Sequence, residues 1–282
     1  MPCYTVKQTD RSVLTVSAKT SPDWKQTFLM MADVHYDNPH CDRRLFRRLL
    51  AEAQEQDAGI MIIGDLMDAM QGRNDHRSAK SDLESQYARN NYYDRIIEDV
   101  YDCLLPYQAN ILFISEGNHE AAITRHNETD LLERLCRQLQ VPHLGYAGFV
   151  RFQFERATGG GRSSKTLWFH HGSGGGGEVT KGTMRAQREA AYIDADIYAS
   201  GHIHQAWALE AEHVRCTDAG KILLTRSVHL CLPTLKQEFD PRGGYHIEKD
   251  RPHKPLGAYW LTFRHNSAEH GRVDFDVARA GA

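Results

Sequence analysis

Side chains that bind metals gather in five short blocks between residues 33 and 204 of this 282-residue chain. Each block directly follows an apolar run of the length expected for a buried strand. The residues of metal-binding type in these blocks are Asp33, His35, Asp65, Asn118, His171, His202 and His204. Carboxylate, imidazole and amide groups together are typical ligands of divalent manganese, iron or zinc. Seven ligands exceed the needs of one ion and suit two, and two ions about 3.5–4 Å apart can hold the attacking and leaving oxygens of a phosphoryl transfer.

The apolar runs predict the strands that position these blocks. Runs at 27–32, 60–63 and 111–114 are separated by amphipathic helices, which we expect at 42–57 and 83–105. Such alternation of strand and helix is typical of parallel βαβ units. Ligands of these sheets bind at the carboxyl ends of the strands, so the blocks are expected to converge there.

The second half of the chain has a different pattern. Residues 149–154 alternate between apolar and polar, which predicts a strand with one face in water. The other expected elements are strands at 166–169, 197–200, 213–217, 221–228, 258–264 and 272–277, helices at 128–140 and 179–192, and a loop at 70–81. We expect a single domain spanning residues 1–282. Residues 1–26, which allow one edge strand, and the proline-rich loop 233–257 are expected to be peripheral elements of it.

The five blocks follow one another in a characteristic order. They are D-x-H at 33–35, G-D-x-x-D at 64–68, G-N-H-E at 117–120, H-G at 171–172 and G-H-x-H at 201–204. In this order they resemble the calcineurin-like metallophosphoesterase family. The resemblance implies an α/β (α+β) fold, in which two facing mixed β-sheets are flanked by helices in a four-layer sandwich. It also implies phosphoester hydrolysis with two divalent metal ions, of which manganese is the first expectation and iron or zinc the alternatives.

The resemblance further implies a role for each residue of the blocks. One metal ion would be held by Asp33, His35, Asp65 and His204, and the other by Asp65, Asn118, His171 and His202. A hydroxide held between the two ions would attack phosphorus in line. His119 would be the general acid that protonates the leaving oxygen, and Asp68 would fix the tautomer of His119.

Two residues beside the blocks are expected to have other roles. His170 precedes the ligand His171, and adjacent residues of a strand point to opposite faces, so His170 is expected to face away from the metals. Metal ligation by His170 is the alternative. Glu120 is expected to start a helix or to support a ligand rather than to bind metal.

Three further segments have less specific patterns. The run Gly172–Gly177 favours a turn, with a phosphate-lining backbone or a moving lid as the alternative. The basic run 43–48 favours a solvated helix face, with phosphate contacts as the alternative. Arg242, Tyr245 and His246 are candidates for substrate contact, against the simpler interpretation of a surface loop.

The residues after the second block separate branches of the family. Ser/Thr protein phosphatases have Arg-Gly at this point, whereas this chain has Ala69 and Met70. The block 64–68 looks more like those of phosphodiesterases and DNA-repair nucleases, and the stretch H-H-G-S-G-G-G-G resembles phage and prophage members. The expected substrate is therefore a phosphodiester, with nucleic acid or a nucleotide as the candidate. A phosphomonoesterase or protein phosphatase, or a binding module without activity, is the alternative.

Composition and charge set the remaining bounds. The chain has no apolar stretch long enough for a membrane-spanning helix and no apolar N-terminal segment typical of a secretory signal. Its six cysteines are widely spaced, which favours free thiols in a reducing compartment, so a cytoplasmic location is expected. The net charge of −3 excludes a basic field over the whole chain but leaves room for a local basic patch.

Overall fold

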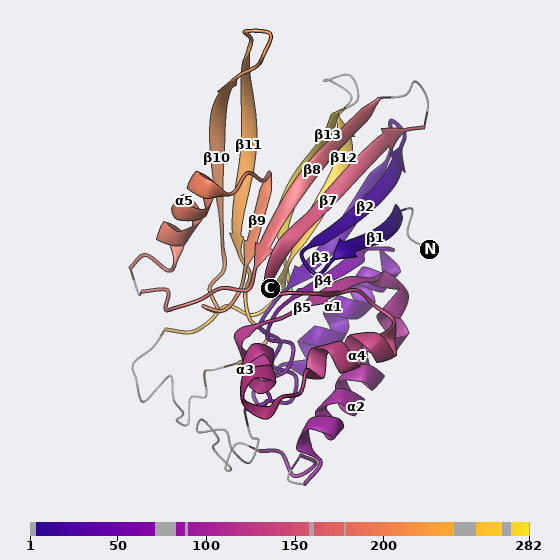
Figure 1. Cartoon of the computed structure of the whole chain (residues 1–282), viewed down its shortest axis with the longest axis vertical. Coiled ribbons are helices and arrows are strands. Elements are labelled where there is room, and N and C mark those ends of the chain that lie inside the picture. The colour runs from indigo at the N-terminus through magenta and orange to yellow at the C-terminus, as the bar shows by residue number, and fades with distance from the viewer. Residues whose placement is uncertain are drawn as a thin grey trace.

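The computed structural model describes residues 4–70, 83–87, 90–157, 161–177, 179–237, 239, 252–266 and 272–281. Its strands form a six-stranded sheet and a seven-stranded sheet, which face each other (Figure 1). Both sheets combine parallel and antiparallel neighbours. Helices lie against the outer faces of this pair of sheets.

The six-stranded sheet has the order β13-β12-β3-β4-β5-β6. Its strands are β3 (Lys25–Met31), β4 (Gly59–Ile63), β5 (Ile111–Ser115), β6 (His143–Leu144), β12 (Ala258–Asn266) and β13 (Arg272–Ala280). Strands β3 to β6 pair in parallel, whereas β12 is antiparallel to β3 and β13. The expected strands at 27–32, 60–63 and 111–114 are therefore confirmed, and they are neighbours in space.

The seven-stranded sheet has the order β1-β2-β7-β8-β9-β11-β10. Its strands are β1 (Tyr4–Asp10), β2 (Val13–Thr20), β7 (Ala147–Arg156), β8 (Arg162–His170), β9 (Ile197–Ser200), β10 (Trp207–Cys216) and β11 (Ile222–Cys231). The pairs β2–β7, β8–β9 and β9–β11 are parallel, and the other pairs are antiparallel.

Two apolar cores hold these layers together. The core between the sheets contains a cluster of aromatic rings, in which Phe28 and Phe263 both pack on Phe152, with ring centroids 5.0 and 4.6 Å apart. The second core lies between the six-stranded sheet and helices. These helices are α1 (Arg43–Glu55), α2 (Tyr92–Leu104), α3 (Asn118–Asn127) and α4 (Leu131–Leu139), while α5 (Thr183–Tyr192) lies beside β9 (Figure 1). The expected fold of two facing mixed sheets flanked by helices is thus confirmed.

Two helices differ from the prediction. Helix α2 begins at Tyr92 rather than near residue 83, and residues 83–87 form a turn whose Tyr87 is fully buried. Helix α3 is not among the helices expected from the sequence, although Glu120 was a candidate for a helix start. Only Glu120 and Ile123 of α3 are buried, so its sequence lacks the apolar stripe that indicates a helix.

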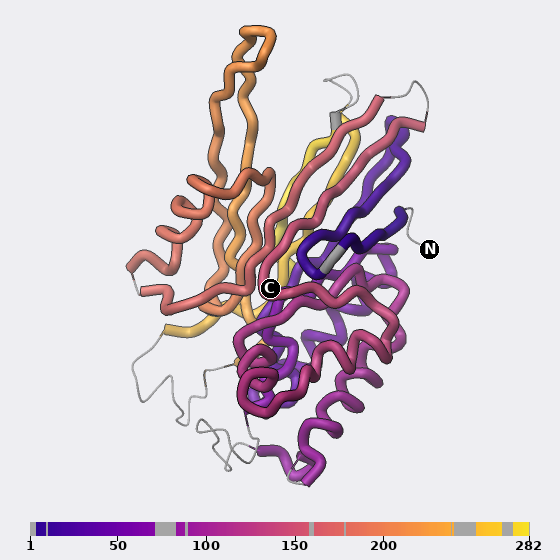
Figure 2. The backbone as a smooth tube through the Cα atoms, in the orientation of Figure 1, coloured from indigo at the N-terminus to yellow at the C-terminus, as the bar shows by residue number. Residues whose placement is uncertain are grey.

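The peripheral segments also differ from the prediction. Residues 1–26 were expected to add one edge strand, but β2 lies inside the seven-stranded sheet between β1 and β7 (Figure 2). Leu14 of β2 is fully buried in the core between the sheets, which explains why this strand is internal. Of the loop 233–257, residues 240–251 lie outside the described residues, and the start of the loop reaches the site described below. The extent of the domain stays a prediction.

Candidate metal centre

The sheets bring all seven predicted metal ligands to one place. Asp33 and Asp65 follow β3 and β4, and Asn118 begins α3 three residues after β5 ends. From the other sheet, His171 follows β8 and His202 follows β9. The carboxyl ends of five strands therefore meet here, as is usual for the ligand sites of parallel sheets.

The backbone is left-handed at most of the ligands. The φ angles are 53° at Asp33, 50° at His35, 50° at Asp65, 71° at His202 and 53° at His204. A residue other than glycine costs about 1–3 kcal/mol in a sparsely populated conformation, so it persists only where the surroundings enforce it. Five such residues within one cluster indicate that the chain turns sharply to aim these side chains at a common point.

The first ligand group consists of Asp33, His35 and His204. Their ligand atoms all lie within 4.8 Å of one another. His204 Nε2 is 3.4 Å from Asp33 Oδ1 and 3.3 Å from His35 Nε2. Asp33 Oδ1 is buried and makes no hydrogen bond in the described structure. A buried carboxylate oxygen facing two imidazole nitrogens is suited to a divalent cation.

The second ligand group consists of Asp65, Asn118, His171 and His202. His171 Nε2 lies 3.1 Å from Asp65 Oδ2 and 3.1 Å from the amide oxygen of Asn118. The same amide oxygen lies 2.6 Å from His202 Nδ1. One carboxylate, one amide oxygen and two imidazoles form a donor set that manganese, iron and zinc accept.

Asp65 connects the two groups. Its ligand atom lies within 4.8 Å of His171 and His202 on one side and of His35 and His119 on the other. Burial would raise the pKa of Asp65, but the neighbouring His171 and His119 outweigh it and lower that pKa well below its usual value. In turn Asp65 outweighs the effect of burial on His171 and raises the pKa of that imidazole. A metal ion displaces the proton of an imidazole that binds it. The ionised Asp65 carboxylate and the His171 ring therefore fit a centre for two divalent cations.

Two glycines allow the strand ends to approach one another. A Cβ atom at Gly117 would collide with the carboxylate and the backbone nitrogen of Asp65. A Cβ atom at Gly64 would collide with the His171 ring, and the φ of Gly64 is 74°. A side chain at either position would therefore push apart residues of the second ligand group.

His119 lies beside the ligands with one ring nitrogen fixed. Its Nδ1 donates a hydrogen bond to the backbone carbonyl of Asp68 at 2.6 Å. Its Nε2 lies 3.7 Å from Asp65 Oδ2, and 12% of its side chain is exposed. A proton held on Nδ1 leaves Nε2 as the nitrogen that can exchange a proton with a bound molecule.

Asp68 supports the site differently from the prediction. Its carboxylate was expected to orient His119, but Asp68 Oδ1 is 3.8 Å from His119 Nδ1 and 2.8 Å from His35 Nδ1. The carboxylate therefore orients the ligand His35, whereas the Asp68 carbonyl orients His119. Asn38 donates to Asp68 Oδ2 at 3.0 Å, and Lys236 Nζ lies 3.5 Å from Asp68 Oδ1. Carboxylates of this kind fix the ring and the tautomer of a ligating histidine.

The buried carboxylate of Glu120 holds together the loops that follow β4 and β5. Glu120 accepts hydrogen bonds from the backbone N–H groups of Asp65, Met67 and Gly117 at 3.0–3.2 Å, which agrees with its expected place at a helix start. Burial raises the pKa of Glu120 to about 7.

Asp37 is a second buried carboxylate, which was not singled out in the sequence although it stands two residues after the first block. It accepts from the N–H groups of Asp68 and Ala69 at 2.7 and 3.0 Å and from the Tyr92 hydroxyl at 2.8 Å. Asp37 therefore fixes the turn that carries Asp68.

The segment after β8 separates its two histidines. His170 Nδ1 accepts from Arg185 Nη2 at 2.6 Å and from the Gly172 N–H at 3.0 Å, so His170 points away from the ligand groups, as expected. Burial and Arg185 lower the pKa of His170 to about 4. Ser173 and Gly175–Gly177 line a cavity of about 510 Å³ together with residues of α5, a position compatible with both interpretations of the glycine run.

The basic run 43–48 has two kinds of arginine. Arg43 is half-buried and pairs with Glu84 at 2.8 Å, so it is structural. Arg44, Arg47 and Arg48 are exposed on α1, as expected for a solvated helix face. Arg242, Tyr245 and His246 lie outside the described residues, so their expected contacts stay predictions.

The two facing mixed sheets with flanking helices have the arrangement of the metallophosphoesterase fold (Figure 1). Residues 26–206 match the family model described as calcineurin-like phosphoesterase, and the chain therefore belongs to that family. The family consists in general of metal-dependent phosphoester hydrolases. No helix among the described residues is long and apolar enough to cross a membrane.

The solved structures that resemble this chain have distant sequences. No curated protein sequence matches this chain. Among solved structures, Vps29 from Chaetomium thermophilum is 11% identical with a TM-score of 0.36, covering 92% of this chain and 97% of that chain. A metallophosphoesterase from Sphaerobacter thermophilus is 12% identical with a TM-score of 0.38, covering 90% and 89%.

Proposed function

We propose that this protein is a phosphodiesterase that uses two divalent metal ions, with nucleic acid or a nucleotide as its substrate. The observation that carries the proposal is the position of Asp65 between two groups of ligand atoms. Manganese is the expected metal, and iron or zinc the alternatives. Two such ions, when bound, would activate water and hold the phosphate oxygens.

The chain's own residues would position the reactants and move one proton. Asp68 and Asn38 hold His35 in place, and Glu120 holds the loops of Asp65 and Gly117. His119 would donate a proton from Nε2 to the leaving oxygen while the Asp68 carbonyl keeps Nδ1 protonated.

The residue directly after Asp68 favours a diester over a monoester. A monoester carries a second negative charge on its phosphate, which a guanidinium directly after the second block could pair. Here Ala69 is fully buried and its N–H donates to Asp37, so this position offers no cation. A diester, which carries one charge, needs no such group.

A comparison of two chromogenic substrates tests the proposal. With manganese present, we expect kcat/KM for bis-p-nitrophenyl phosphate to exceed that for p-nitrophenyl phosphate by at least about tenfold, or about 1.4 kcal/mol. The chelated protein should hydrolyse neither substrate. A preference for the monoester would contradict the diester assignment. No hydrolysis with manganese, iron or zinc would indicate a binding module without activity.

A further inference from the structure

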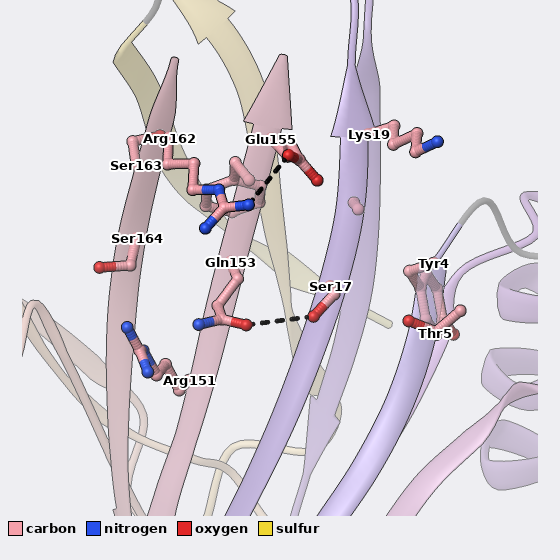
Figure 3. A pocket seen from close by; sticks show the side chains of 12 residues that line it. Tyr4, Thr5, Ser17, Lys19, Arg151, Gln153, Glu155, Arg162, Ser163 and Ser164 are labelled. Atoms are coloured by element: carbon pink, nitrogen blue, oxygen red, sulfur yellow. Dashed lines mark hydrogen bonds and ion pairs between the residues drawn. The ribbon is translucent and has the colours of Figure 1, made fainter. Parts of the chain in front are cut away.

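The outer face of the seven-stranded sheet contains a groove of about 810 Å³ over β1, β2, β7 and β8 (Figure 3). Hydroxyl and amide groups form much of its lining. The Ser17 hydroxyl and the Gln153 side-chain amide are hydrogen-bonded at 3.3 Å, and Ser164 of β8 stands opposite Gln153 in the sheet register. The groove therefore spreads over four strands, outside the metal centre, and combines these polar side chains with apolar lining.

The charges along this groove are mainly positive. Lys19, Arg151 and Arg162 line it, and Glu155 is the one carboxylate among the lining residues. Glu155 lies 3.3 Å from Arg162, which neutralises part of that charge (Figure 3). Arg151 is exposed beside the groove. In a chain with a net charge of −3, this is a local basic patch of the kind that contacts phosphates.

A row of rings leads from the groove to the metal centre. Alternation along β7 and β8 places Phe149 beside Arg151 on the outer face, and the ring centroid of Phe149 lies 4.7 Å from that of Trp168. Trp168 lies 6.4 Å from His170, and His170 lies 5.3 Å from Tyr146.

The last ring of the row adjoins a predicted ligand. The centroid of Tyr146 lies 5.5 Å from that of His171. From Ser164 to His170 strand β8 spans about 20 Å at 3.3 Å per residue. The groove and the rings therefore follow the direction of β8 toward His171, the residue directly after the end of that strand.

We propose that this outer face of β7 and β8 binds a single-stranded nucleic acid and directs it to the metal centre. The proposal deepens the proposed phosphodiesterase function and rests on it. The cations of the groove would pair with successive phosphates, and the partly exposed rings of Phe149 and Trp168 would stack on unpaired bases. A sheet with basic side chains and partly exposed aromatic rings is a surface on which single strands bind, because their bases are free to stack. In a duplex these base faces are already covered.

Binding to a metal-free protein tests this surface without any hydrolysis. The probe is a fluorescently labelled single-stranded DNA 12-mer, titrated in the presence of chelator. Replacing two exposed cations of the groove, Lys19→Gln with Arg151→Gln, should raise Kd at least tenfold at low salt. The slope of log affinity against log salt should fall by about 1.4, because each lost phosphate contact removes about 0.7. The matched control, Arg44→Gln with Arg48→Gln on α1, should change neither value.

The outcomes separate the two proposals. Unchanged affinity in the groove variant, equal losses in the control variant, or equal affinity for a 12-base-pair duplex would overturn the single-strand surface. The same proteins, loaded with manganese, should hydrolyse bis-p-nitrophenyl phosphate at the wild-type rate, since this small diester does not reach the groove. If the wild type binds the 12-mer as expected but cleaves no diester, the phosphodiesterase proposal fails while the binding surface stands.

Discussion

Replacing His119 by alanine should lower kcat on a phosphodiester by about 10²–10⁴-fold, the range typical of a lost general acid. The variant should still bind divalent metal, because none of the proposed ligands is removed. The reason lies in the geometry of the ring: Nδ1 is held by the Asp68 carbonyl at 2.6 Å, and Nε2 is left to face the substrate.

The leaving group provides a sharper readout for His119. A p-nitrophenolate leaves readily without a proton, whereas a nucleoside alkoxide needs one, so the loss should be much larger for a dinucleotide than for bis-p-nitrophenyl phosphate. His126→Ala serves as the control, since His126 is exposed on the same helix α3. Full activity of His119→Ala, or an equal loss with both substrates, would remove His119 from the acid role.

Replacing Asp65 by asparagine should have the largest effect on metal content. Loss of a residue that only orients a metal ligand costs about 10–100-fold in affinity or activity. Asp65 faces both ligand groups, so Asp65→Asn should lower kcat/KM by more than about 100-fold and reduce the bound metal to at most one ion per chain. Metal analysis and steady-state kinetics on the same preparation measure both quantities.

Two further variants are compared with Asp65→Asn. Asp68→Asn removes the carboxylate that orients His35, and its loss of kcat/KM should lie within the 10–100-fold range. Asp218→Asn, in the exposed turn between β10 and β11, should behave as wild type. If Asp65→Asn retained two ions, Asp65 would not connect the two ligand groups.

The buried strands could be predicted from the sequence because tertiary burial and local pattern agree there. Every residue of β4 and β5 is buried, and both appear in the sequence as uninterrupted apolar runs with polar blocks after them. The structure brings the seven predicted ligands together at the ends of these strands and of β8 and β9. Their roles as metal ligands stay predictions.

The remaining features depend on contacts between distant parts of the chain. Strand β2 pairs with β7 more than 130 residues away, and no local pattern distinguishes this internal position from an edge. Helix α3 is held in place by Glu120, which accepts hydrogen bonds from backbone N–H groups, and not by an apolar stripe. Its sequence therefore lacks the helical periodicity of apolar residues that would predict it. Whether the Asp68 carboxylate turns to His35 or to His119 is decided by Asn38 and Lys236, which lie nearby only after folding.

The most direct test of the central claim is the metal content of the wild-type chain. The protein is equilibrated with manganese, freed of unbound metal by gel filtration and analysed by mass spectrometry of the metal. We expect about two divalent ions per chain, with phosphodiesterase activity that rises as the second ion binds and disappears on chelation. One ion or none per chain in an active preparation would contradict the two-metal centre.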